Sequence, residues 1–150
     1  MEQKSRCKWC NPKNSKYIKY HDKEWCKPNF NEKYLFEMLI LESFQAGLSW
    51  ECVLNKREDF RKAYDNFEID KICKYDDKKI QELMQNEKII RNKLKIKASI
   101  NNAQIFKEIV MRKRFIHILW AVFGTGILMV ILAFVAIWFG MIGYMPDIED

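Results

Sequence analysis

The residues best suited to chemistry lie in the first third of this 150-residue sequence. Thiol and imidazole groups, which zinc prefers as ligands, occur at Cys7, Cys10, His21 and Cys26. Flat aromatic faces lie among them, at Tyr17, Tyr20, Trp25 and Trp50. The stretch therefore offers ligands for a metal and rings for a planar ligand, although aromatic residues at such spacings also serve as ordinary core residues.

Glu42 is an acidic residue inside an otherwise apolar run, ILESF. A carboxylate in such a run is expected to be desolvated, so it needs a hydrogen-bond donor, a cation or a functional role. The alternative is an acid that turns to the surface or pairs with a lysine. The pattern does not decide between these interpretations.

The elements that must position these residues are predicted to be helices. Residues 1–30 are expected to be irregular. A central helix should begin after Asn31 as its N-cap and end at Gly47, and Ser49 can cap a second helix that runs through Tyr64. Further helical segments are predicted at 69–73, from Asp76 or Asp77 through Met84, and at about 89–106. Alternating strand patterns are absent, which makes the predicted fold class all-α.

The sequence divides into a basic part and an apolar part, although its overall formal charge is only +6. All 26 basic residues lie at or before Arg114, and no charged residue occurs from Phe115 to Met145. About 20 such residues cross a hydrocarbon core of about 30 Å, so residues 116–142 are predicted to form a single transmembrane helix. Residues 1–110 are then one domain, and residues 111–150 are a basic flank, this helix and a short acidic tail.

The charges around the apolar run predict its orientation. Arg112, Lys113 and Arg114 precede the run and acidic residues follow it, so the positive-inside rule places the N-terminal domain in the cytoplasm. The five cysteines are an odd number in a segment expected to face the cytoplasm, which argues against a disulfide framework. No oligomer is expected.

A basic cluster precedes and overlaps the start of the last helix of the N-terminal domain. Its members are Lys88, Arg91, Lys93, Lys95 and Lys97. Such residues suit contacts with nucleic-acid phosphates, whose strength falls with salt. A solvated, lysine-rich helix surface is the alternative, and both interpretations stay open.

Residues 5–106 carry a series of short motifs in a fixed order, of which YHDKEW at 20–25 and QAGLSW at 45–50 are the most specific. The others include RCKW at 6–9, LFEM at 35–38, KRE at 56–58 and IIRN at 89–92. Together they resemble the bacterial DNA-3-methyladenine glycosylase I family. The resemblance implies an all-α helix-hairpin-helix enzyme of base-excision repair that hydrolyses the N-glycosidic bond of 3-methyladenine in alkylated DNA. Such enzymes extrude the base and bind it in a pocket.

The resemblance also implies roles for individual residues. Glu42 matches the pocket carboxylate of the family and is the candidate catalytic residue, acting through recognition and electrostatics. Tyr20 and Trp50 match the hydrogen-bonding and stacking residues, and Trp9 and Tyr17 match neighbouring positions in the substrate pocket. The lesion is cationic, so a carboxylate and electron-rich rings complement it.

For the metal, the resemblance implies a structural zinc with Cys7 and His21 as two of its ligands. The other two ligands of the family, and its phosphate-binding hairpin, have no counterpart in this sequence. We therefore expect an incomplete zinc site and weak or no base release. Cys10 and Cys26 would complete a four-ligand set with the spacing Cys-x2-Cys-x10-His-x4-Cys as an alternative, and the absence of metal is a third interpretation.

The tail from Met111 to Asp147 resembles, more weakly, the first residues of bifunctional penicillin-binding proteins. This resemblance suggests a fusion or a gene-model join. A second function class therefore stays open: a nonenzymatic, single-pass membrane protein with a zinc-binding or remnant domain in the cytoplasm.

Overall fold

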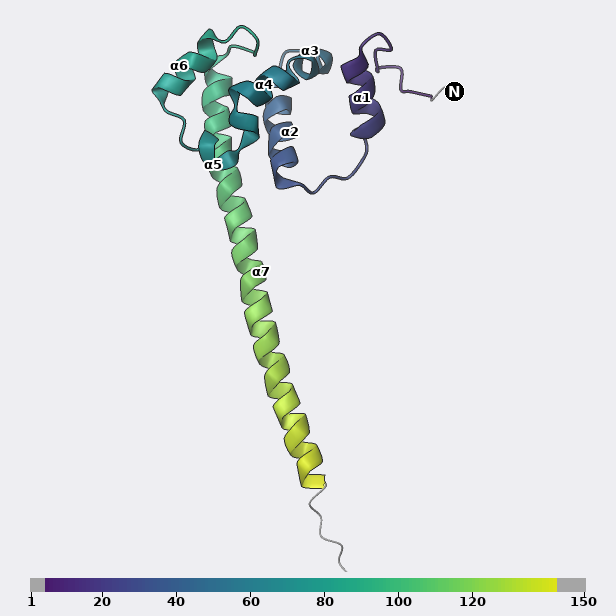
Figure 1. The fold of residues 1–150 in the computed structure, drawn as a ribbon, viewed down its shortest axis with the longest axis vertical. Helices are drawn as coiled ribbons and strands as arrows, with labels where there is room; N and C mark the ends of the chain where they lie inside the picture. Colours follow the sequence, from purple (N-terminus) through teal and green to yellow (C-terminus); the bar gives the residue numbers. More distant parts are fainter. Residues whose placement is uncertain (1–4, 143–150) are drawn as a thin grey trace, which may run out of the picture. The chain divides into compact units, whose positions relative to one another are not determined.

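The computed structural model describes the backbone of residues 5–142 and the side chains of residues 5–135. The chain divides into two units, with the boundary between Lys107 and Glu108. The described residues form helices and no strand, which confirms the all-α prediction (Figure 1). In chain order the elements are α1 (Ser15–Lys23), α2 (Glu32–Gln45), α3 (Trp50–Asn55), α4 (Arg57–Ala63), the 3-10 turn η1 (Asp65–Phe67), α5 (Ile69–Ile72), α6 (Asp77–Gln85) and α7 (Lys93–Ile142).

Three helix starts lie where the capping residues predict them. The side chain of Asn31 accepts a hydrogen bond from the Tyr34 amide, and that of Ser49 accepts one from the Cys52 amide. Asp76 caps α6 in the same way. A side-chain oxygen at the N-cap satisfies an amide that the helix leaves unpaired, so these starts follow from the local sequence.

Three details of the predicted helices are wrong. Residues 1–30 contain α1, whose start is capped by Asn14 and whose buried face carries Tyr17 and Tyr20. The helix predicted from Ser49 to Tyr64 is two helices, because it breaks at Lys56. The last helix begins at Lys93 instead of residue 89, since the Asn92 side chain accepts hydrogen bonds from the Leu94 and Lys95 amides.

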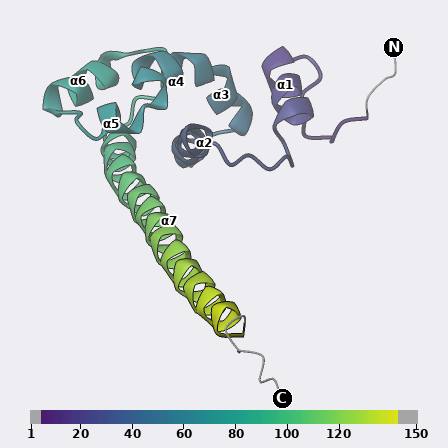
Figure 2. The same cartoon turned by 60° about the horizontal axis from the view of Figure 1, so that its bottom comes forward.

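The core of the first unit is built around α2. Phe36, Ile40, Leu41 and Phe44 of α2 are completely buried and pack with residues of α3 to α7. The opposite face of α2 is open, because Leu35 is 42% exposed. Helix α3 packs against both α1 and α2 (Figure 2). These three helices carry the candidate site.

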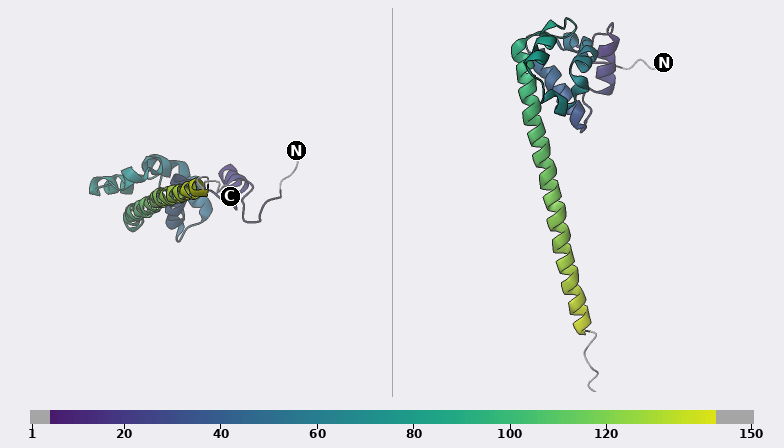
Figure 3. Two further views of the ribbon diagram at one scale, coloured as in Figure 1. Left: turned by 90° about the horizontal axis from the view of Figure 1, so that it is seen from below. Right: turned by 60° about the vertical axis from the view of Figure 1, so that its left-hand side comes forward.

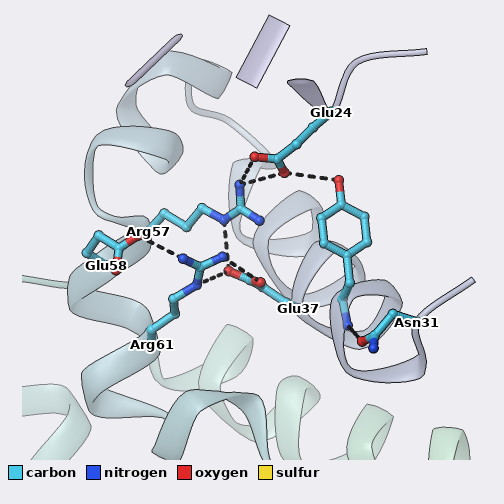
Figure 4. Close-up of polar contacts among 7 residues, drawn as sticks. Glu24, Asn31, Glu37, Arg57, Glu58 and Arg61 are labelled. Atoms are coloured by element: carbon cyan, nitrogen blue, oxygen red, sulfur yellow. Dashed lines mark hydrogen bonds and ion pairs between the residues drawn. The ribbon is translucent and has the colours of Figure 1, made fainter. Parts of the chain in front are cut away.

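A buried ion-pair network joins α1, α2 and α4 (Figure 4). Glu37 of α2 is 6% exposed and accepts hydrogen bonds from Arg57 Nε at 2.8 Å and from Arg61 Nε at 2.7 Å. Arg57 Nη1 also donates to both carboxylate oxygens of Glu24, at 3.0 and 2.8 Å. The Tyr34 hydroxyl donates to the same carboxylate at 3.0 Å. The network therefore fixes the C-terminal end of α1 against α2 and α4.

The network predicts a pH dependence of stability. Burial by itself raises the pKa of Glu37, but the hydrogen bonds from Arg57 and Arg61 outweigh burial and leave the pKa below its usual value. The unfolded carboxyl has a pKa of about 4.3, so the contribution of Glu37 is present above that pH and is lost as the pH falls through the lower, folded pKa. Urea unfolding of the full chain in detergent, from about pH 6 to pH 3, measures this loss. We expect Glu37→Gln to reduce the acid-dependent loss; an unchanged pH profile would contradict the assignment.

The second unit begins at Glu108 and consists, as far as it is described, of the remainder of α7. Figure 3 shows α7 as one uninterrupted helix. Helix α7 contains an 18-residue window with a mean hydropathy of 2.6, and none of this window is buried. Its length and composition are sufficient for it to cross a membrane. The Thr125 hydroxyl donates to the Ala121 carbonyl at 2.9 Å, so this polar group is satisfied within the helix. The predicted span 116–142 is thus the later part of a longer helix.

Candidate functional site

A cavity of about 370 Å³ lies in the first unit, between α1, α2, α3 and the segment before α1. Its lining residues are Trp9, Tyr17, Tyr20, Trp25, Glu42, Gln45 and Trp50. All five residues predicted to recognise or process a substrate are among them. The cavity adds two residues that the site prediction omitted, Trp25 and Gln45.

The aromatic lining residues contact one another. Trp9 lies 5.1 Å from Trp25, ring centre to ring centre, with the rings 74° apart. Tyr20 and Trp50 meet in a similar edge-to-face pair at 5.5 Å and 65°. Such pairs are favourable because the positive edge of one ring meets the negative face of the other. The rings therefore hold one another in place around the cavity.

The helices position the aromatic residues through a small apolar cluster beneath the cavity. Tyr17 and Tyr20 are three residues apart on the buried face of α1. They pack against Met38 of α2 and Leu54 of α3. Trp50 is the first residue of α3, directly after the Ser49 cap, and packs against the same cluster. Helices α1 and α3 thus bring rings to the cavity, and α2 contributes the polar side chains of Glu42 and Gln45.

Glu42 is exposed while lining the cavity, which agrees with the interpretation that the acid turns to the surface and not with a desolvated carboxylate. The physical reason is the orientation of α2, which buries Glu37, Ile40 and Phe44 and leaves Leu39 and Glu42 on the open face. Glu42 has no hydrogen-bond or ion-pair partner within the part of the chain whose side chains are described, residues 5–135. An uncompensated negative charge therefore faces a cavity bounded by aromatic rings.

Tyr20 and Trp50, which line the cavity, each carry a hydrogen-bond donor. Burial is the largest cause of the raised pKa of Tyr20, and the negative charge of Glu42 raises this pKa further. The Trp50 indole lowers it, but by less. The phenol therefore keeps its proton at neutral pH. The Trp50 Nε1 atom is buried and makes no hydrogen bond of normal geometry with the described residues. A buried donor without a partner costs about 1–3 kcal/mol, so a ligand that accepts this hydrogen bond would gain affinity.

Comparison with known proteins identifies the family. The methyladenine glycosylase family model matches residues 9–129, most of the chain. The chain belongs to the methyladenine glycosylase family. The match runs past residue 110 into the apolar stretch, beyond the predicted domain boundary. The DNA-3-methyladenine glycosylase of Haemophilus influenzae is 46% identical over 102 residues, which are 68% of this chain and 55% of that protein.

Solved structures of methyladenine glycosylases share the fold of the first unit. A 3-methyladenine DNA glycosylase I superposes with a TM-score of 0.70 and 39% identity, covering 73% of this chain and 59% of that one. A variant of such an enzyme, in complex with 3-methyladenine, superposes with a TM-score of 0.66 and 34% identity over the same fractions of the two chains. The chain thus spans somewhat more than half the length of these relatives.

The two zinc ligands implied by the family resemblance lie close together. The Cys7 amide donates to His21 Nε2 at 3.3 Å, and His21 Nδ1 lies 3.0 Å from Asp22 Oδ1. Both ring nitrogens are therefore engaged, which leaves no lone pair for a metal in this arrangement. Among the described side chains of residues 5–135, no three His, Cys, Asp or Glu residues form a group that could hold a metal ion. The described residues do not fit a closed zinc site.

The four-ligand alternative is accordingly not formed. Cys10 is buried, with only 5% of its surface exposed, whereas Cys7 and Cys26 are exposed. Burial raises the pKa of the Cys10 thiol, which disfavours the thiolate that zinc binds. A zinc ion held by Cys7 and His21 stays a prediction.

The members of the basic cluster differ in their exposure to solvent. Lys88, Arg91, Lys93 and Lys97 are exposed, as both interpretations require. Lys95 is half-buried, and its ammonium group donates to the backbone carbonyls of Phe44 and Ala46. Neither interpretation describes Lys95 fully, because two of its three N–H donors are used within the domain.

Proposed function

We propose that this chain is a DNA glycosylase that recognises 3-methyladenine in alkylated DNA and hydrolyses its N-glycosidic bond in base-excision repair. The observation that carries the proposal is the cavity in which the unpaired Glu42 carboxylate lies among five aromatic residues. The family membership and the relative crystallised with 3-methyladenine support it.

The cavity has the chemistry that the lesion requires. N3-methylated adenine in DNA carries a positive charge, which the faces of Trp and Tyr and a carboxylate attract. When the glycosidic bond breaks, its electron pair goes to the base and neutralises that charge, while water supplies the new hydroxyl on the sugar and releases its other proton to solvent. The charge thus makes the base a good leaving group. We assign recognition and electrostatic stabilisation to Glu42, and stacking to Trp50.

The exposure of Glu42 predicts slow base release. Two unit charges 4 Å apart attract by about 1 kcal/mol in bulk water and by about 4 kcal/mol at an effective dielectric constant of 20. A carboxylate that water reaches therefore stabilises a cationic lesion less than an enclosed one does. We infer that the chain binds the methylated base but hydrolyses its glycosidic bond slowly.

A glycosylase assay tests the proposed function. The full chain in detergent is incubated in excess with DNA that carries 3-methyladenine, and the free base is quantified by chromatography. We expect slow release that falls about tenfold in Glu42→Gln, because the charge is lost, and stays unchanged in the neighbouring Ser43→Ala. Release at the uncatalysed rate, or release insensitive to Glu42, would contradict the proposal.

A second candidate function rests on α7. We propose that residues 116–142 cross a membrane once, with residues 1–110 on the cytoplasmic side, where Arg112, Lys113 and Arg114 would lie. The apolar composition of this helix supports the proposal. A single membrane span is compatible with an anchored glycosylase and also with the nonenzymatic, single-pass alternative. The suggestion that this chain is a fusion with the first residues of a penicillin-binding protein stays a prediction.

Membrane extraction checks the anchor. We expect the chain to remain with membranes after alkaline carbonate washing, because a helix with no charge through its centre has no favourable place in water. A variant with arginine at both Leu128 and Val130 should be released or degraded, since each charge costs about 2.5–3.5 kcal/mol at the centre of a span. Complete release of the unmodified chain by carbonate would show that residues 116–142 do not span a membrane.

A further inference from the structure

Lys95 lies where α2 ends, although it comes from the first turn of α7. Its Nζ atom donates to the Phe44 carbonyl at 2.9 Å and to the Ala46 carbonyl at 2.6 Å. The last carbonyls of a helix lack partners within the helix and carry its negative dipole end, so a lysine there both satisfies and neutralises them. The side chain is half-buried and points into the domain, unlike the exposed Lys93 and Lys97 on either side of it.

Of the two carbonyls that Lys95 binds, that of Phe44 lies in the last turn of α2 and that of Ala46 lies in the turn between α2 and α3. The Leu48 amide would continue the helix by donating to Phe44, but it donates to the Gln45 carbonyl instead, at 2.6 Å. Ala46 has φ −48° and ψ 116°, and Gly47 has φ +80°, the angles of a type II turn. The turn thus leaves the Phe44 carbonyl without its helical partner, and Lys95 supplies one.

This turn joins two residues that line the cavity. Gln45 is the last residue of α2, and Trp50 is the first residue of α3. The backbone between them sets how far apart their side chains lie. Nothing lies within 4 Å of the position that a Cβ atom on Gly47 would occupy, so the tip of the turn is not held by packing at that point. The hydrogen bonds from Lys95 therefore restrain this turn together with its own Leu48–Gln45 hydrogen bond.

We propose that Lys95 is a positioning residue for the base cavity, which acts by holding the turn from Gln45 to Leu48 so that Gln45 and Trp50 meet the ligand at a fixed separation. The inference rests on the proposed function, because the ligand in question is the methylated base. Lysine suits this role since its three donors reach two carbonyls from a flexible stem. Methionine has a stem of similar length and no donor.

The test compares Lys95→Met with the unmodified full chain in detergent. The dissociation constant for 3-methyladenine, measured by tryptophan fluorescence, is expected to rise about tenfold, while Lys97→Met leaves it unchanged. Lys95→Arg, which keeps donors at this position, should restore affinity to within about threefold. In a Gln45→Ala background the Lys95→Met change should have a clearly smaller effect, because one of the two side chains it positions is gone. A merely structural role of Lys95 predicts neither the rescue nor this coupling.

A ligand-free measurement separates this inference from the proposed function. Amide hydrogen exchange of Leu48 should accelerate at least tenfold in Lys95→Met, while that of Leu41 in the middle of α2 stays slow. If the unmodified chain does not bind 3-methyladenine, the proposed function fails. If the amide exchange of Leu48 is unchanged in Lys95→Met, the role of Lys95 fails, whether or not the base binds. Equal affinity of Lys95→Met and the unmodified chain overturns the inference. Should Lys95→Met not fold, Lys95→Ala, which also has no side-chain donor, takes its place, with the same outcome expected and the same result overturning it.

Discussion

Replacing Arg57 with alanine is expected to lower the free energy of unfolding by about 3–5 kcal/mol, the range measured when one partner of a buried ion pair is removed. Arg57 has a side chain only 9% exposed and bonds to the carboxylates of Glu37 and Glu24. Without it, Glu37 keeps one cation, Arg61, and Glu24 keeps only the Tyr34 hydroxyl among the bonds described here. A buried negative charge without its main partner is what makes the change costly.

Denaturant unfolding of the full chain in detergent measures the effect, with Glu58→Ala as the matched control. Glu58 pairs with Arg61 at the exposed edge of the same network, with a side chain 60% exposed. Exposed pairs contribute about 0.2–1 kcal/mol, so this control should change stability little. If Arg57→Ala proved as mild as Glu58→Ala, the network would not hold α1, α2 and α4 together as argued.

Replacing Trp50 with alanine is expected to weaken binding of 3-methyladenine by about 5- to 150-fold, since stacking of a base on an aromatic side chain contributes about 1–3 kcal/mol. Trp50 lines the cavity and packs edge to face with Tyr20, so its removal loses a stacking surface and loosens the neighbouring ring. Its removal also takes away the Nε1–H donor, which is buried and has no hydrogen bond of normal geometry with the described residues.

Two variants separate these contributions. Trp50→Phe keeps a ring face but loses the Nε1–H donor, so its affinity should lie between those of the unmodified chain and Trp50→Ala. Trp120→Ala removes an exposed tryptophan that does not line the cavity and should leave affinity unchanged. Isothermal titration calorimetry in detergent reports all of them without relying on tryptophan fluorescence. Unaltered binding by Trp50→Ala would show that the base binds elsewhere.

Local signals in the sequence were sufficient for much of the fold. Asn31, Ser49 and Asp76 each cap a helix through contacts with the next three residues, which is why these starts could be predicted. Helix α1 was missed because its lysines obscure a buried face of only two tyrosines. The break at Lys56 has no proline or glycine to mark it.

The cavity residues could be named from motifs, but the two carboxylates of α2 could not be distinguished. Glu37 and Glu42 both lie in the run LFEMLILESF, whose apolar residues surround the helix and so indicate no single buried face. Which carboxylate is buried depends on Arg57 and Arg61, at least twenty positions further along the chain. The role of Lys95 depends likewise on carbonyls some fifty residues before it.

The most direct test of the base-binding cavity is a titration of the full chain in detergent with free 3-methyladenine and, separately, with adenine. The lining tryptophans Trp9, Trp25 and Trp50 provide the fluorescence signal. We predict saturable quenching by 3-methyladenine, at least tenfold weaker binding of adenine, and, in Trp50→Ala, saturation only at concentrations about 5- to 150-fold higher. Equal binding of the two bases, or no saturable binding of 3-methyladenine, would contradict the account.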